Sequence, residues 1–183
     1  MGKRSSFQHT DKNFWRTPFE AVVPLIPHLD SMEFDEPCCG EMDLVRHLEA
    51  FGLTCGNATD IRDGFDALKM RDTPSDRIIT NPPWERSLLH PLIDHLRQLR
   101  PTWMLIDADW AFTKQAIPYM EFCERFVAVG RVKWVPDSPH AGKDNCAWYL
   151  FREVEVETRF VAQMPRDQFD RIARRASRGE VVA

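Results

Sequence analysis

The sequence predicts an α/β fold with a mostly parallel, twisted sheet and helices on both of its faces. The main observation is an alternation along the chain, in which short apolar runs of strand length are followed by segments whose apolar residues recur at helical spacing. This alternation is typical of strands joined by helical crossovers, and such strands are parallel. The second observation is size and composition. With 183 residues, 43% of them hydrophobic and 28% charged, the chain fits a single globular domain.

The first half of the chain predicts a helix, two strands separated by a second helix, and a third strand. We expect the first helix over 18–28, because Thr17 is a favourable N-cap residue and Pro18 suits the first helical position. The second helix shows apolar residues at helical spacing and ends at a glycine (Leu44, Leu48, Phe51 and Gly52). Strands are expected at 32–36, 53–61 and 77–80.

The second half of the chain continues the alternation. A wide apolar stripe predicts a helix over 87–99, and the apolar run at 103–106 predicts a buried strand. We expect a helix over 110–122 that is kinked at Pro118, because proline inside a helix removes a backbone hydrogen bond. Further strands are expected at 126–135, 146–154 and 158–162, and a last helix at 166–176.

Four residues directly after the third strand carry the main functional signal, Asn81-Pro82-Pro83-Trp84. Ligand sites in open α/β sheets lie outside the carboxyl ends of the strands. Two consecutive prolines fix the backbone and remove two N–H donors, so that the backbone offers only carbonyl oxygens. The Asn81 side-chain oxygen and the Pro82 carbonyl could both accept hydrogen bonds from one –NH₂ group, and Trp84 offers a flat face for stacking. These four residues therefore predict catalysis at an exocyclic amine, the alternative being a rigid turn.

Two segments upstream of this motif suggest a nucleotide-containing cofactor. The stretch from Phe34 to Leu44 reads as a strand end, a turn and a helix, in which Gly40 would allow close backbone approach to a ligand. Asp60 ends the second strand, where an acidic residue can bind ribose hydroxyls. The segment 64–68 then supplies another acid and apolar residues, which suit an adenine amine and its ring face.

Taken in order, the motifs Glu-Pro-x-x-Gly, Asp60, Asp66 and Asn-Pro-Pro-Trp resemble those of class I S-adenosylmethionine-dependent methyltransferases. Within that class, residues 13–151 look most like the small phage and prophage DNA adenine methyltransferases. The resemblance implies a Rossmann-like, seven-stranded sheet with a C-terminal antiparallel hairpin, which 142–149 would open. It also implies S-adenosylmethionine as cofactor, bound by Thr17, Pro18, Glu36, Pro37, Cys38, Gly40, Asp60, Ile61, Asp66, Ala67 and Asn81.

Met42 departs from the pattern of that family. The usual sequence is Gly-x-Gly, and Met42 replaces the second glycine. A side chain of this size would project toward the methionine end of the cofactor or into the first turn of the helix. Two alternatives follow: the loop shifts and still binds the cofactor, or the chain is a cofactor-free binding protein that keeps the fold. The intact motif from Asn81 to Trp84 favours the enzyme.

The motif alone does not identify the substrate. Asn-Pro-Pro-aromatic sequences occur in DNA adenine, RNA adenine, RNA guanine amine and protein glutamine methyltransferases. We expect nucleic acid, with N6 of adenine in DNA favoured, because Trp84 is a large stacking surface and a duplex base must be flipped into such a pocket. The substrate-binding residues would be Trp84, Lys133, His140 and Lys143, the last three in or beside the loop at 136–145.

Chain length and charge limit how a nucleic acid could be bound. The chain has no room for a separate target-recognition domain, so we expect short or relaxed sequence recognition or help from a partner subunit. The net charge of −4 argues against a protein that coats nucleic acid by charge alone. Residues 155–183 would form an extension with a basic helix, whose arginines either face solvent or contact phosphates. Residues 1–13 are expected to be flexible.

The remaining features exclude other kinds of site. Five cysteines without a CxxC pair indicate neither a disulfide framework nor a zinc site. Asp107 and Asp109 could suggest a metal, but methyl transfer needs none, and we expect Asp109 to cap the following helix. No apolar run could span a bilayer, and no signal peptide is visible. We therefore expect a cytoplasmic protein, encoded by a phage or prophage in a bacterial host.

Overall fold

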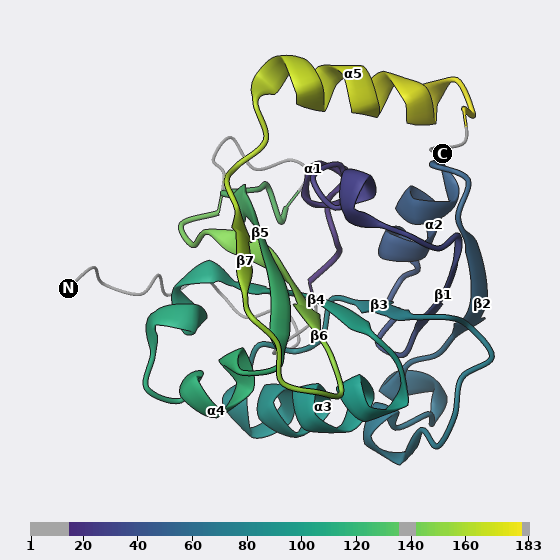
Figure 1. Cartoon of the computed structure of the whole chain (residues 1–183). Coiled ribbons are helices and arrows are strands. Elements are labelled where there is room, and N and C mark those ends of the chain that lie inside the picture. The colour runs from purple at the N-terminus through teal and green to yellow at the C-terminus, as the bar shows by residue number, and fades with distance from the viewer. Residues whose placement is uncertain (1–14, 136–141, 181–183) are drawn as a thin grey trace.

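The computed structural model describes residues 15–135 and 142–180, and a seven-stranded sheet lies at their centre (Figure 1). The strand order is β2-β1-β3-β4-β6-β5-β7. Along the chain the strands are β1 (Glu33–Glu36), β2 (Thr54–Ala58), β3 (Ile78–Thr80), β4 (Thr102–Asp107), β5 (Cys123–Gly130), β6 (Cys146–Phe151) and β7 (Arg159–Val161).

Four of the six strand pairs are parallel. β1 pairs in parallel with β2 and with β3, and β3 with β4. β6 is antiparallel to both of its neighbours, β4 and β5, while β7 adds to β5 in parallel at the edge. The predicted mixed sheet, mostly parallel with an antiparallel hairpin near the C-terminal end, is confirmed. Because β6 runs against the others, β1, β2, β3, β4, β5 and β7 all have their carboxyl ends at one edge.

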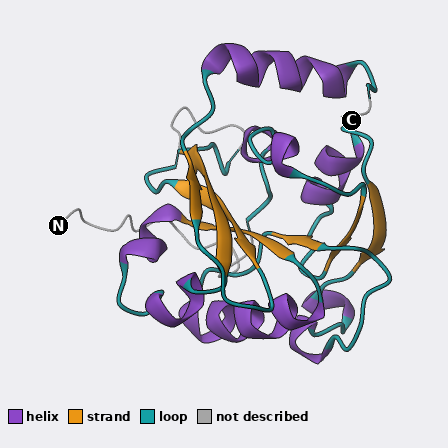
Figure 2. Cartoon of the chain, in the orientation of Figure 1, coloured by secondary structure: helices purple, strands orange, loops and turns teal. Residues whose placement is uncertain are grey.

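Helices cover both faces of the sheet (Figure 2). Side chains of α1 (Phe19–Val22), α2 (Asp43–Glu49) and α5 (Arg166–Ser177) share one apolar cluster with Phe34 and Trp103 of the sheet. The opposite face carries α3 (Arg86–Leu99), the 3-10 helix η4 (Ala108–Phe112) and α4 (Ile117–Met120), which share a second cluster. The residues of each strand therefore alternate between two separate cores, as a three-layer α/β arrangement requires.

The prediction of one helix over 18–28 is wrong. The segment forms only α1, which ends at Val22, and a 3-10 helix, η1 (Ile26–His28). Pro24 and Pro27 explain the interruption, because proline lacks the N–H that would continue a helix. Thr17 is not the N-cap either: Pro18 holds that position and the cap has no side-chain hydrogen bond.

The prediction of one kinked helix over 110–122 is also wrong. Two short helices, η4 and α4, replace it, and Pro118 lies in the first turn of α4, where its missing N–H costs nothing. Asp107, rather than Asp109, caps η4, and its carboxylate accepts a hydrogen bond from the Asp109 N–H at 3.0 Å. The strand predicted over 126–135 begins earlier, at Cys123, and ends at Gly130, which has a positive φ of 91°.

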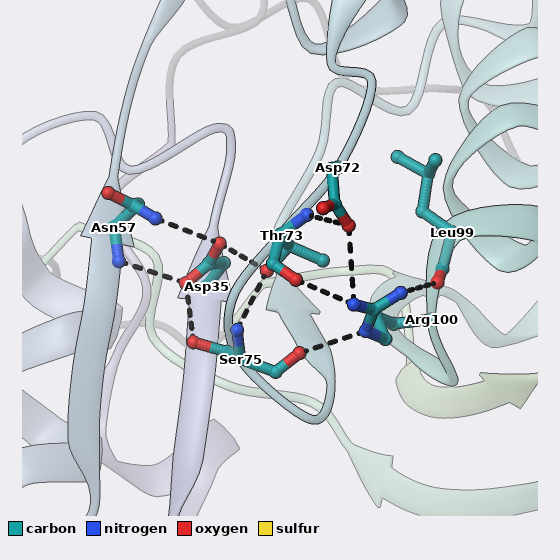
Figure 3. Close-up of polar contacts among 7 residues, drawn as sticks. All are labelled: Asp35, Asn57, Asp72, Thr73, Ser75, Leu99 and Arg100. Atoms are coloured by element: carbon teal, nitrogen blue, oxygen red, sulfur yellow. Dashed lines mark hydrogen bonds and ion pairs between the residues drawn. The ribbon is translucent and has the colours of Figure 1, made fainter.

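A buried polar network, rather than a helix, fixes the segment before β3 against β1 and β2 (Figure 3). The Asp35 carboxylate, on β1, is 1% exposed and accepts hydrogen bonds from Thr73, from Ser75 and from both nitrogens of Asn57. Arg100 holds the same segment by donating to the carbonyl oxygens of Thr73 and Ser75. The network fixes β1 at the residue before Glu36.

Within the described ranges, no helix combines the length and apolar character needed to cross a membrane. The same ranges contain no group of three or more histidine, cysteine or acidic side chains placed to hold a metal ion.

Candidate functional site

The candidate site lies at the carboxyl ends of β1 and β3, where the order of strands reverses. β2 follows β1 on one side of the sheet, whereas β3 lies on the other side of β1. Ligands of open α/β sheets bind at such a reversal, because the connections leave in opposite directions and open a crevice. Because β1 and β3 are neighbours, the loop after Glu36 and Asn81 both lie at this edge of the sheet.

Glu36 is a buried carboxyl group at the carboxyl end of β1. Its residue is 1% exposed, and its Oε1 accepts hydrogen bonds from the Thr80 hydroxyl at 2.5 Å and the Cys38 N–H at 2.9 Å. Burial raises the pKa of Glu36 to about 8, and the contacts from Thr80, Cys38 and the Asn81 backbone offset only part of that effect. Oε2 makes no hydrogen bond of ordinary geometry to any described residue.

Replacement of Glu36 by glutamine tests this burial through the pH dependence of stability. With a folded pKa of about 8 against an ordinary value of 4.5, the folded chain keeps a proton that the unfolded chain has released. The free energy of unfolding should therefore fall as pH rises through this window. Glutamine keeps the Oε1 acceptor and does not titrate. In urea unfolding, the free energy of unfolding of Glu36→Gln should rise relative to that of the parent between pH 5 and pH 8. A difference between the two proteins that stays constant with pH would refute the raised pKa.

The Asn81 side chain is oriented by two acceptors from the N-terminal segment. Its Nδ2 donates to the Thr17 hydroxyl at 3.1 Å and to the Trp15 carbonyl at 3.4 Å. A carbonyl oxygen can only accept, so the contact with Trp15 fixes the –NH₂ group on that side. Oδ1 is then the atom left to accept a hydrogen bond from a ligand. Thr17 therefore contacts Asn81, a role that the sequence did not predict.

Trp84 belongs to an aromatic cluster at the mouth of the crevice. Its indole Nε1 donates to the Leu105 carbonyl, on β4, at 2.9 Å. Trp134 packs edge to face on Trp84 with ring centroids 5.4 Å apart, and Trp15 lies 6.5 Å from Trp134. The three rings come from three segments far apart in sequence. Both Trp15 and Trp134 flank predicted motifs, since Trp15 precedes Thr17 and Trp134 follows Lys133 in the sequence.

A cavity of about 780 Å³ borders Trp84 on the side of α3. Its walls include Glu85 and Arg86 after β3, Asp107 and Asp109 at the end of β4, and Asp144 in the loop before β6. The volume lies in the range of small-molecule sites. Four carboxylates against one arginine give it a negative lining, which suits a ligand with amine donors and disfavours phosphate.

Met42 adopts the backbone conformation that glycine would take. Its φ of 66° and ψ of 17° are left-handed, and Gly40 is also left-handed with φ of 52°. The Met42 side chain packs against the core shared by α1 and α2. Next to it, Arg16 makes two hydrogen bonds of 2.7 Å to the Asp43 carboxylate, which ties the N-terminal segment to the start of α2.

Asp60 stabilises the loop after β1 by hydrogen bonds to the backbone of that loop and to Arg62. One carboxylate oxygen accepts the Gly40 N–H at 2.9 Å, and the other accepts from the Arg62 backbone and guanidinium. Burial would raise the pKa of Asp60, but these hydrogen bonds outweigh it and keep the pKa below its usual value. Beside it, the Ile61 side chain is 65% exposed, which leaves an apolar surface free to cover a ligand.

The predicted cofactor residues do not all come together. Hydrogen bonds connect Thr17 with Asn81, Glu36 with Cys38, and Gly40 with Asp60. Pro37, which follows Glu36, is buried, and Pro18, which follows Thr17, is half-buried. Asp66 caps the 3-10 helix η3 (Ala67–Lys69) and pairs with Lys69 at 3.2 Å, and Ala67 packs on the core that includes α3. In the described ranges no hydrogen bond joins Asp66 to the loop after β1.

Of the predicted substrate residues, Lys133 and Lys143 are exposed and make no ion pair with any residue that the structure describes. His140 lies outside the described residues, as does most of the loop over 136–145. Gly142, at the end of that loop, donates to the Val132 carbonyl at 2.8 Å, so the two ends of the loop lie side by side next to Trp134.

Comparison with known proteins supports the fold but not a particular family. No protein-family model matches the sequence, and no curated protein sequence is similar to it. Among solved structures, the methyltransferase subunit of a type I restriction-modification system of Streptococcus thermophilus is similar with a TM-score of 0.54 at 9% identity, over 94% of this chain and 55% of that one. This chain therefore spans little more than half of that subunit.

Two further structures show the same likeness. A predicted O-methyltransferase of Agrobacterium tumefaciens is similar with a TM-score of 0.55 at 9% identity, over 91% of this chain and 98% of that one. A proposed class I S-adenosylmethionine-dependent methyltransferase of Listeria monocytogenes has a TM-score of 0.50 at 10% identity, over 87% and 68% of the chains. At these identities the likeness shows the fold alone, which is the Rossmann-like fold of class I methyltransferases.

Proposed function

We propose that this chain is an S-adenosylmethionine-dependent methyltransferase that methylates N6 of adenine in DNA, with the base flipped into the cavity beside Trp84. The observation that carries the proposal is the geometry of Asn81. Its –NH₂ group is held by Trp15 and Thr17, so that Oδ1 is available at the carboxyl end of β3. An acceptor in this position would bind an exocyclic amine together with the Pro82 carbonyl.

The proposed chemistry requires little more than positioning. The cofactor would supply an electrophilic methyl group on a sulfonium: the amine nitrogen would form the new N–C bond as the S–C bond breaks and a neutral thioether leaves, and the methylated nitrogen would then lose its extra proton to solvent. Asn81 Oδ1 and the Pro82 carbonyl would accept the two amine hydrogens and draw the nitrogen lone pair out of conjugation with the ring. Trp84 would hold the base by stacking, and its own ring is fixed by the hydrogen bond to Leu105. The acceleration would come from orientation and preorganised dipoles, without a charged base.

The loop after β1 suits the cofactor that the fold implies. Left-handed Gly40 and the buried Glu36, whose Oε2 has no hydrogen bond within the described residues, border the crevice. Asp60 fixes the Gly40 N–H, and exposed Ile61 offers an apolar cover. We propose that Thr17, Pro18, Glu36, Pro37, Cys38, Gly40, Asp60, Ile61 and Asn81 line the cofactor site, with Asp66 and Ala67 at its outer end.

The Met42 geometry favours an enzyme over a cofactor-free binding protein. The backbone at Met42 has the left-handed conformation that a glycine adopts without strain, which is the conformation expected where glycine is usual. The Met42 side chain packs on the core of α1 and α2, and this position does not require it to crowd the methionine end of the cofactor.

Added S-adenosylmethionine should therefore raise the thermal midpoint of the protein. A ligand at a hundred times its Kd that binds only the folded state adds about 2.7 kcal/mol, or roughly 5–10 °C for a chain of this size. Differential scanning fluorimetry with the cofactor, with its demethylated product and with adenosine triphosphate as control measures this. An unchanged midpoint at millimolar cofactor would support the binding-protein alternative instead.

The substrate is tested by methyl transfer from labelled S-adenosylmethionine to DNA, RNA and protein in parallel. DNA is favoured because one structural neighbour is a restriction-modification methyltransferase subunit, and because the cavity and Trp84 suit a planar base with amine donors. Label recovered as N6-methyladenine from DNA would support the proposal. Label found only in RNA, or only on protein glutamine, would keep the chemistry and replace the substrate.

A further inference from the structure

Helix α5 has an arginine face opposite its apolar face. Phe169, Ile172, Ala173 and Ala176 pack on the core shared with α1 and α2. At 100° per residue, the arginines Arg171, Arg174, Arg175 and Arg178 lie on the opposite side of the helix. Five of the 24 basic residues of the chain fall between positions 166 and 178, in a protein whose net charge is −4. The arginine face, defined by these four residues, is thus a local basic surface on an acidic protein.

The charges of this face are unequally compensated. Arg178 and Arg175 lie 3.7 Å and 3.9 Å from Glu180, which are long contacts for ion pairs. Arg166, at the side of the helix, pairs with Asp170 at 3.0 Å. At the same 100° per residue Asp167 lies among the arginines, and Asp167, Asp170 and Glu180 line the same hollow as the four arginines. Arg171 and Arg174 are both exposed and have no ion-pair partner among the described residues. They are therefore the two positive charges most available to a ligand.

Helix α5 begins at the carboxyl ends of the parallel strands, beside β7, and β4, β6 and β5 lie between β7 and the β3 strand of the candidate site. β7 runs parallel to β5, so both strands end at the same edge of the sheet. The Gln163 side chain, between β7 and α5, donates to the Val129 carbonyl near the end of β5 at 3.0 Å, which fixes the start of α5 there. The cavity beside Trp84 has four carboxylates and one arginine in its lining, and this negative charge disfavours a phosphate chain there. We therefore expect the phosphates of the substrate to be bound outside this cavity.

We propose that the arginine face of α5 binds the phosphate backbone of the nucleic-acid substrate, as a sequence-independent anchor on the face of the sheet opposite the cavity beside Trp84. The inference rests on the proposed function. Arginine forks fit phosphate oxygens in bidentate geometry, which favours this ligand over a diffuse surface charge. A membrane is disfavoured because the apolar face of α5 packs on the core and has nothing to insert into lipid.

The test is the salt dependence of DNA binding, measured by fluorescence anisotropy with a labelled duplex and the full chain. Arg171→Gln and Arg174→Gln are compared singly with Arg159→Gln, an exposed arginine that begins β7 at the opposite edge of the sheet. Each loses one positive charge, so the comparison controls for net charge. Removal of one phosphate contact should reduce the slope of log K against log salt by about 1, and weaken binding roughly five- to tenfold at 0.1 M salt.

We expect this reduction in both α5 variants and an unchanged slope in Arg159→Gln, with the same cofactor-induced rise in midpoint in all three. Equal slopes in all variants and the parent would overturn the inference, and so would a parent without salt-dependent DNA binding. If methyl transfer to DNA persists while the slopes are equal, only the arginine face is refuted and the proposed function stands. Loss of binding to phosphatidylserine vesicles, without a change in DNA slope, would assign the face to membranes and also refute it.

Discussion

Replacement of Asn81 by alanine is expected to lower kcat by about 10²–10³-fold while leaving cofactor affinity nearly unchanged. In other enzymes, loss of one preorganised hydrogen-bonding group at the reacting centre lowers kcat by a factor of this size. In Asn81→Ala the amine would keep the Pro82 carbonyl but lose the acceptor that Trp15 and Thr17 orient. Single-turnover methyl transfer measures the chemical step, and the cofactor-induced rise in midpoint measures binding.

Thr17→Ala is the matched comparison, because it removes only one of the two acceptors that orient Asn81. The contact with the Trp15 carbonyl would remain, so kcat should fall less than in Asn81→Ala, with the KM for DNA unchanged. Both variants should keep the circular dichroism spectrum of the parent. Full turnover by Asn81→Ala would show that the proposed mechanism is wrong, and a larger loss in Thr17→Ala would show that Thr17 acts through something other than Asn81.

The position of the site could be predicted because it depends on strand ends. Asn81 follows a buried strand directly, and Glu36 ends another, so parallel pairing brings both to one edge of the sheet. The prediction needed only the strands and their direction, which the alternation of the sequence indicates. The mixed sheet and its antiparallel hairpin were predictable on the same grounds, together with the resemblance to class I methyltransferases.

Hydrogen-bond partners within the site could not be predicted in this way. Thr17 looked like a helix N-cap, yet its hydroxyl accepts from Asn81, 64 residues later in the chain. Asp60 looked open for ribose, yet the Gly40 and Arg62 donors already engage both of its oxygens. Thr17 contacts a partner that only the tertiary fold brings close, and Asp60 combines such a partner, Gly40, with a local one, Arg62.

Helix boundaries failed for a different reason. Between 18 and 28 and between 110 and 122 the apolar spacing is helical, but prolines interrupt both segments. The apolar residues there still face the core, as buried Ala21, Ile26 and Trp110 show. Short turns of helix satisfy that pattern as well as one continuous helix does, so apolar periodicity could not distinguish between them.

The Asp35 network shows a structural requirement next to the site that no motif identifies. Asp35 precedes Glu36, and four hydrogen bonds from β2 and the segment before β3 converge on its buried carboxylate (Figure 3). Gly56 belongs to the same arrangement, since a Cβ there would lie 2.5 Å from Ser75 Oγ and 2.8 Å from Asp35 Oδ1. The network fills the place where apolar packing would otherwise hold this segment, so its loss leaves several buried donors unsatisfied.

Replacement of Asp35 by alanine should therefore lower the free energy of unfolding by about 3–5 kcal/mol, because donors that lose a charged acceptor in the interior stay unpaired. The thermal midpoint should fall by roughly 10 °C or more. Asp72→Ala is the control, since that side chain is 80% exposed and its loss should cost under about 1 kcal/mol. If Asp35→Ala is too unstable to purify, Ser75→Ala removes one donor and should cost about 1–2 kcal/mol in urea unfolding. A loss in Asp35→Ala no larger than in Asp72→Ala would show that the network does not hold β1, and that apolar contacts alone fix the strand that leads into Glu36.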